Sequence, residues 1–260
     1  MTKPLKIYWS ASLKNGKKNF GDWLSPTICE IITRRRVVWA PPQKCDLAAV
    51  GSILQKFTKN RWWRPVKNIW GSGFLEQKSP FCSQHNFHAV RGKYSAQIIR
   101  NKDIEILGDP GLLCYLLSTP SPHKKYALGI VPHYKDQENK LVHNFAKNNK
   151  HVVVIDILSD PHNFIQRVQE CEIILSSSLH GLIVADTFSI PNAWVCLSSL
   201  VRGNGFKFYD YYSAFGIETA QPFPFNAQTT LKEIECIPQN YSRQHINTIQ
   251  QKLLQSFPLL

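Results

Sequence analysis

Three serines and a histidine stand where a buried strand gives way to a helix. The segment SSSLHGLIVADTFSIPNAWV, residues 176–195, follows an apolar run at residues 173–175 and continues as an apolar helix. Backbone N–H groups at a helix start are unpaired, and together with the helix dipole they favour a bound anion. The pattern predicts an anion site in which His180 gives or takes a proton beside the anion. The residues predicted to bind it are Ser176, Ser177, Ser178, Leu179 and Gly181. The alternative is that Ser177 or Ser178 only caps the helix.

A second acid–base candidate lies near the N-terminus. The segment NFGDW, residues 19–23, follows the first apolar strand and a lysine-rich loop at residues 14–18. Asp22 can accept a proton from a sugar hydroxyl, or it can simply cap the helix that begins there.

Other predicted strands also end in glycines, hydroxyls or charges. Ligands of parallel α/β sheets bind outside the carboxyl ends of the strands, so we expect these loops to line one rim, although each can also be an ordinary turn. Arg91 is the first choice for a carboxylate or phosphate, because its guanidinium fork matches either. The further binding candidates are Ser72, Gly73, Ser95, Asp109 and His133.

Alternating strand and helix patterns must position these residues, and they predict an α/β fold with parallel sheets. The expected strands are residues 5–9, 37–39, 47–50, 68–70, 87–90, 105–107, 127–131, 152–155, 173–175 and 193–197. The proline-rich segment TPSPHKK, residues 119–125, is typical of a linker. We therefore predict two doubly wound, Rossmann-like halves facing each other across a cleft, residues 1–120 and 121–260. A helix near the C-terminus can pack back on either half.

Composition limits the classes of partner. The net charge of +13 favours an acidic partner: a nucleic acid, an anionic membrane surface or a charged substrate. No apolar run is long enough for a transmembrane helix, and the N-terminus lacks a signal-peptide pattern, so we expect a cytoplasmic protein. The 7 cysteines show no CxxC spacing, so neither a metal site nor a cofactor is expected.

Five cations alternate with aromatic residues in the segment KFTKNRWWRPVK, from Lys56 to Lys67. Tryptophan beside lysine and arginine is typical of a peripheral contact with the inner face of a membrane. A solvated loop explains the pattern equally well. A nucleic-acid partner is not expected, because the sequence carries no RNA- or DNA-binding motif.

The motifs NFGDWLSP, GSGFL, VRGKYS, GDPGLL, IVPHY, SSSLHGLIVADTFSIPNAWV and GFKFYDYYSAFG, in this order, resemble the polysaccharide pyruvyl transferase family. The resemblance implies a fold like that of GT-B glycosyltransferases, with the acceptor on the N-terminal half and the donor on the C-terminal half. It also implies transfer of a pyruvyl unit from phosphoenolpyruvate to a sugar, which can be lipid-linked, in surface polysaccharide, capsule or lipopolysaccharide synthesis. The product is a pyruvate ketal and no metal takes part. Some relatives carry arginine at the position of Ser178, so Arg91, Lys93, Arg202 or Lys207 is expected to supply that charge here.

Two other functions remain open from sequence. A GT-B glycosyltransferase would need an acidic residue for the ribose of a nucleotide sugar, and Asp156 or Asp160 is available. A non-catalytic basic module would instead depend on the cations of residues 56–67, and both Asp22 and His180 would be dispensable.

Overall fold

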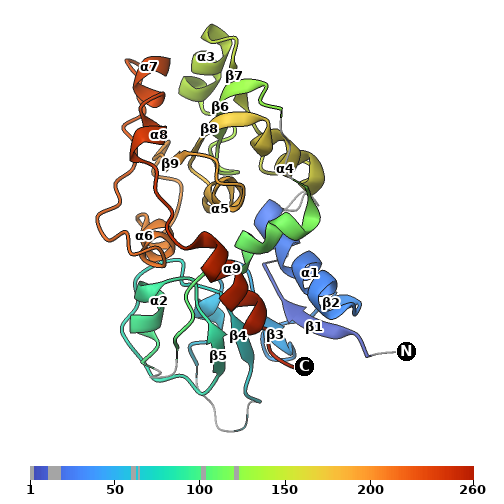
Figure 1. Ribbon diagram of the computed structural model, residues 1–260. Helices are drawn as coiled ribbons and strands as arrows, with labels where there is room; N and C mark the ends of the chain where they lie inside the picture. Colours follow the sequence, from blue (N-terminus) through green and yellow to red (C-terminus); the bar gives the residue numbers. More distant parts are fainter. Residues whose placement is uncertain (1–2, 11–18, 60–62, 64, 101–103, 120–122) are drawn as a thin grey trace. The chain divides into compact units, whose positions relative to one another are not determined.

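The computed structural model describes residues 3–10, 19–59, 63, 65–100, 104–119 and 123–260 (Figure 1). Three predicted features lie wholly or partly outside the described residues. They are the lysine-rich loop at residues 14–18, residues 60–62 and 64 of the basic segment, and residues 120–122 of the predicted linker. Contacts divide the chain into two compact units, each described below by itself. Unit 1 comprises Met1–Leu113, Arg202–Thr219 and His245–Leu260, and unit 2 comprises Cys114–Val201 and Ala220–Gln244.

Unit 1 is built on a parallel sheet of five strands in the order β2-β1-β3-β4-β5. Its strands are β1 (Leu5–Tyr8), β2 (Val37–Trp39), β3 (Leu47–Ala48), β4 (Asn68–Trp70) and β5 (Asn86–Ala89). Its helices are α1 (Phe20–Thr33), η1 (Leu54–Lys56), α2 (Lys93–Ile98), α6 (Phe206–Ser213) and α9 (Ile246–Gln255), and η2 (Pro110–Leu117) crosses into unit 2. The central strand β3 is apolar and wholly buried, as expected for a parallel sheet covered on both faces.

Unit 2 repeats this arrangement with four parallel strands in the order β7-β6-β8-β9. Its strands are β6 (Tyr126–Val131), β7 (Val152–Val154), β8 (Cys171–Ser176) and β9 (Asn192–Trp194). Its helices are α3 (Lys140–Asn148), α4 (Pro161–Gln169), α5 (Leu179–Thr187), α7 (Leu231–Ile234) and α8 (Ile237–Asn240). In both sheets the chain reverses its direction of winding beside the first strand, the order found in doubly wound, flavodoxin-like sheets.

The predicted α/β class with parallel sheets is confirmed, but the chain is divided differently from the prediction. It leaves unit 1 after Leu113 rather than at residue 120, and it returns twice, with α6 and α9. The C-terminal helix α9 is fixed to unit 1 by the Trp70 indole, whose Nε1 donates to the Leu253 carbonyl at 2.9 Å. The strand expected at residues 105–107 is reduced to a single bridge between Val90 and Leu107. The cleft between the halves stays a prediction.

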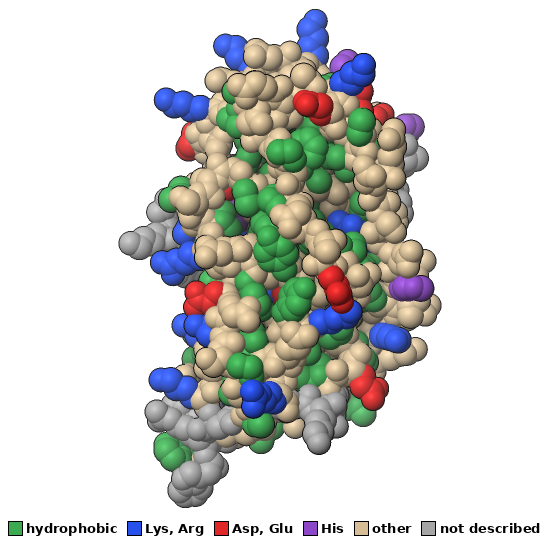
Figure 2. Space-filling model, turned by 90° about the vertical axis from the view of Figure 1, so that its left-hand side faces the viewer, with side chains coloured by type: hydrophobic (Ala, Val, Ile, Leu, Met, Phe, Trp, Pro, Cys, Tyr) green, Lys and Arg blue, Asp and Glu red, His purple; other side chains and the backbone are tan. Residues whose placement is uncertain are grey.

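Two surface properties are also relevant. Within the described ranges, no helix has both the length and the apolar character needed to cross a lipid bilayer. On the face shown in Figure 2, lysine and arginine side chains project from many separate places, with fewer acidic side chains between them. The positive charge on that face is therefore spread rather than gathered in one patch.

Candidate functional site

The serine–histidine segment lies at the switch point of the unit 2 sheet. β8 ends at Ser176 and pairs with β6, the strand from which the chain winds in both directions. Helix α5 begins two residues beyond Ser177, at Leu179. Open α/β sheets bind their ligands outside the carboxyl ends of the strands at such a point. The fold thus places the predicted anion site where this architecture favours a ligand.

Two of the three serines bond within the protein. Ser176 Oγ lies 2.9 Å from the Val131 carbonyl and 2.7 Å from the Ser178 carbonyl, and it accepts from the Ser178 N–H at 3.0 Å. Ser177 Oγ donates to Asp136 at 2.9 Å and accepts from the His133 N–H at 2.8 Å. These hydroxyls hold the loops after β6 and β8 together, which leaves them little capacity to bind a ligand.

Ser178 differs from the other two. It is the N-cap residue of α5, with extended backbone, but its side chain makes no capping hydrogen bond. The simple capping alternative therefore does not account for this serine. Ser178 is 3% exposed, and we retain it as the serine of the candidate site because of its place at the helix start.

Asp136 was missed by the sequence reading. Its side chain is 3% exposed, and its two carboxylate oxygens accept from Ser177 Oγ and from Ser198 Oγ, the latter at 2.5 Å. The available signal was its place in the loop after β6, three residues beyond His133. Asp136 fixes the loops at the carboxyl edge of the sheet.

The two predicted histidines both follow strands of this edge. His180 is the second residue of α5; the residue is partly exposed, while its ring Nε2 is buried. His133 is also partly exposed, and its ring lies against Tyr134 with 4.3 Å between the ring centroids. A histidine beside an anion site can act as a general acid or base.

Leu179 and Gly181 serve packing. The Leu179 side chain is 3% exposed and belongs to the core. A Cβ on Gly181 would lie 2.4 Å from Ser176 Oγ, so glycine allows the close approach of α5 to β8.

In unit 1, Arg91 meets an anion that belongs to the chain itself. Its side chain is 0% exposed, and Nε donates to the Asp210 carboxylate of α6 at 2.8 Å. Nη1 donates to Ser52 Oγ at 2.6 Å and Nη2 to the Phe74 carbonyl at 2.5 Å. Arg91 does bind a carboxylate, as predicted, but that carboxylate belongs to Asp210 of the protein itself. We therefore leave Arg91 out of the proposed function.

Asp210 also completes the start of helix α2. It accepts from the Ser95 N–H and from Ser95 Oγ, both at 2.7 Å. On the same helix start, the Lys93 N–H donates to Ser213 Oγ of α6 at 2.8 Å. The anion-binding groups after β5 are therefore engaged by α6, a contact between residues more than a hundred positions apart that the sequence pattern did not reveal.

The remaining candidates of unit 1 are mostly buried. Ser72 Oγ donates to the Ala49 carbonyl, and a Cβ on Gly73 would lie 2.3 Å from Arg91 Cζ. Asp109 is 0% exposed and accepts from the Gly111 N–H at 2.9 Å, and burial raises its pKa to about 6. Lys207 is 8% exposed, with Nζ 5.1 Å from the centroid of the Phe208 ring.

Asp22 lies in the first turn of α1 but is not its cap. The cap is Asn19, whose side chain accepts from the Gly21 N–H at 3.1 Å. Burial raises the pKa of Asp22 to about 7, and the Asp22 charge also contributes to a raised pKa at Tyr8, where burial is the larger cause. A carboxyl group that titrates near neutrality is suited to proton transfer.

No group of three His, Cys, Asp or Glu side chains in the described part of the chain could hold a metal ion.

Comparison with known proteins identifies the family. The family description of polysaccharide pyruvyl transferases matches residues 3–195, which include the serine–histidine segment and the strands on either side of it. The chain belongs to the polysaccharide pyruvyl transferase family. It is 35% identical over 180 residues to an uncharacterized protein of Acanthamoeba polyphaga mimivirus, covering 66% of this chain and 61% of that protein. It is 26% identical over 178 residues to the succinoglycan biosynthesis protein ExoV of Rhizobium meliloti (strain 1021), covering 66% of this chain and 54% of ExoV.

The matched part of this polysaccharide pyruvyl transferase chain thus covers less than two thirds of the length of each of these two proteins. The family match ends at residue 195, before α6, so Asp210 lies outside the matched part while its partner Arg91 lies inside it.

Proposed function

We propose that the protein transfers a pyruvyl group from phosphoenolpyruvate to a sugar of a surface polysaccharide or of its lipid-linked precursor. The observation that carries the proposal is the partly exposed His180, close in sequence to Ser178, at the start of α5 and at the switch point of a parallel sheet. Membership of the family and similarity to a succinoglycan biosynthesis protein support a saccharide acceptor.

The proposed reaction needs two proton movements. One sugar hydroxyl adds to C2 of phosphoenolpyruvate while C3 gains a proton and becomes a methyl group. A second hydroxyl then replaces phosphate at C2 and closes the ketal. The two hydroxyl hydrogens end on C3 and with the released phosphate, so no other reactant is required. We assign delivery of the C3 proton to His180 and removal of an acceptor proton to Asp22.

Anion binding in this proposal rests on the start of α5. The helix has nine residues, and its dipole and first N–H groups favour the negative charge of the donor. The nucleotide-sugar alternative gains no support, because the two carboxylates considered for the ribose accept hydrogen bonds from backbone N–H groups two or three residues further along the chain. Asp160 accepts from the N–H groups of residues 162 and 163, and Asp156 accepts from the Leu158 N–H.

Acceptor-dependent release of phosphate from phosphoenolpyruvate tests the proposal. The wild-type protein is compared with His180→Gln, and His151→Gln, which changes an exposed histidine of the same unit, is the matched control. Loss of a general acid should lower the rate roughly 100-fold or more. Full activity of His180→Gln refutes its role, and calorimetric binding of a nucleotide sugar in place of phosphoenolpyruvate refutes the reaction.

A further inference from the structure

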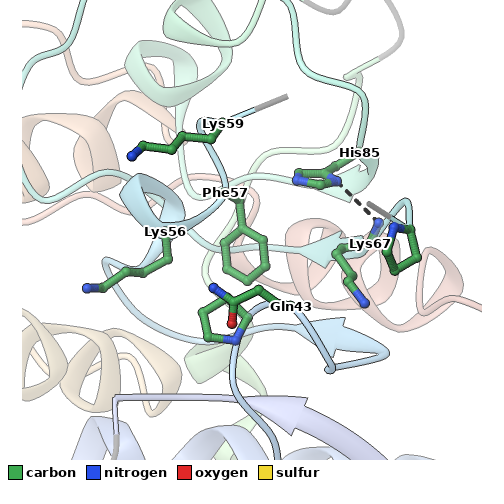
Figure 3. A pocket seen from close by; sticks show the side chains of 8 residues that line it. Gln43, Lys56, Phe57, Lys59, Lys67 and His85 are labelled. Carbon is green, nitrogen blue, oxygen red and sulfur yellow. Dashed lines mark hydrogen bonds between the residues drawn. The ribbon is translucent and has the colours of Figure 1, made fainter. Parts of the chain in front are cut away.

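Unit 1 contains a basic pocket that the transfer reaction does not use. Its lining consists of three lysines, one histidine, one phenylalanine, two prolines and one glutamine (Figure 3): Lys56, Lys59, Lys67, His85, Phe57, Pro42, Pro65 and Gln43. No lining residue is acidic, so the pocket has a strong positive charge.

Lys67 is the decisive residue of this basic pocket. Its side chain belongs to a residue only 7% exposed, and Nζ donates to the Cys45 carbonyl at 2.8 Å. Among the described residues, no carboxylate lies within ion-pair distance of this ammonium group. A nearly buried charge without a counter-charge is unfavourable, and a bound anion would supply what is missing.

His85 and Phe57 shape the interior. His85 is 8% exposed, and its Nδ1 accepts from the Lys67 N–H at 3.2 Å, the contact drawn in Figure 3. Burial and the Lys67 charge both lower the pKa of His85. Because Nδ1 accepts a hydrogen bond, the hydrogen of the ring is placed on Nε2. The Phe57 ring meets the His85 ring edge-on, with 5.8 Å between the centroids. The interior therefore offers hydrogen-bond donors above an apolar ring.

The other two cations lie at the rim. Lys56 and Lys59 extend from the segment around Phe57 and are exposed (Figure 3), so their flexible side chains can fold over a ligand. Lys67 and His85 directly precede β4 and β5, whereas Ser72 and Arg91 follow these strands. The basic pocket thus lies toward the amino-terminal edge of the sheet, away from the edge where the sequence placed the reaction.

We propose that the basic pocket is a binding site for a phosphate group. The phosphate belongs either to a soluble phosphorylated compound or to the headgroup of a phospholipid. The second source fits the exposed side chains on the same segment, because Trp63 is 61% exposed and Val66 50% exposed. Three ammonium groups and an imidazole N–H match the charge and the acceptor oxygens of a phosphate.

Two probes separate the sources, both applied to the full chain. Inorganic pyrophosphate is titrated by calorimetry, and sedimentation is measured with phosphatidylcholine vesicles that contain or lack phosphatidic acid. The pocket variants are Lys67→Met and the double variant Lys56→Gln/Lys59→Gln. The matched control is Lys44→Gln/Lys252→Gln, which removes two exposed lysines that do not line the pocket. The rim variant alters exposed side chains only, so it keeps the test valid if Lys67→Met does not fold.

Binding of either probe, weakened at least tenfold by the rim variant and little changed in the control, supports the site. Binding of pyrophosphate but not of the vesicles identifies a soluble ligand. Binding of vesicles that contain phosphatidic acid, without binding of pyrophosphate, identifies a phospholipid headgroup. If the control variant weakens binding of the probe as much as the rim variant does, the effect is due to net charge alone and the proposal is overturned. Wild-type protein that binds neither probe overturns it as well. None of these readouts depends on pyruvyl transfer.

Discussion

Removing the Asp210 carboxylate should destabilise unit 1 strongly. The carboxylate accepts from Nε of Arg91, lies 2.8 Å from its Nη2, and accepts from both the N–H and the hydroxyl of Ser95. Both charged side chains are 0% exposed. Asp210→Asn keeps the shape but leaves a buried guanidinium without its counter-charge. Breaking a buried pair from one side costs about 3–5 kcal/mol.

Urea denaturation measures this loss. With a slope of about 2–3 kcal/mol per molar urea, the midpoint should fall by about 1–2 M. Peptide-resolved hydrogen exchange over residues 86–98 then assigns the loss to β5 and α2. The control is Glu218→Gln, which removes the ion pair with Lys93, where both side chains are largely solvated. Exposed pairs contribute only about 0–1 kcal/mol.

A double variant separates the charge from the packing. Arg91→Met/Asp210→Leu removes both charges together, so it should recover much of the loss seen in Asp210→Asn. The reasoning is refuted if Asp210→Asn loses less than about 1 kcal/mol, the range of an exposed pair. It is also refuted if the double variant is no more stable than the single one.

Three further outcomes are expected from equilibrium unfolding. The pKa of Asp22 is about 7 in the folded protein against 3.8 unperturbed, so its contribution to stability is complete below pH 3.8 and is lost as pH rises through 7. A shift of about three pKa units corresponds to roughly 4 kcal/mol, so Asp22→Asn should gain about that much on wild type between pH 4 and pH 8, and an unchanged difference contradicts this. Ser177→Ala leaves the buried Asp136 without one donor and should cost about 1–3 kcal/mol, visible as faster hydrogen exchange in the loop after β6. Gly181→Ala places a Cβ 2.4 Å from Ser176 Oγ and should cost about 1–3 kcal/mol, and a stable variant would show that α5 can move from β8.

Local pattern in the sequence predicted most of the fold. Apolar runs separated by helical patterns indicated parallel strands, and the observed strands begin and end inside the expected ranges or within two residues of them, apart from residues 105–107. That segment has an apolar pattern but only Leu107 pairs, with Val90, because pairing depends on a neighbour that a local pattern does not specify. The place of the serine–histidine segment between β8 and α5 was also predictable, because strand end and helix start are both local features.

Tertiary structure decided what each polar group meets. The sequence indicated that Arg91 and the start of α2 suit an anion, and the fold supplies one from Asp210, 119 residues further along the chain. It likewise determined that Ser177 bonds to Asp136, 41 residues away, and that α9 returns to unit 1. The types of residue set the chemistry that is available, because charge and hydrogen-bonding capacity are local properties. Which of these groups remain open to a ligand depends on long-range packing, because a buried polar group takes the nearest partner that the folded chain brings to it.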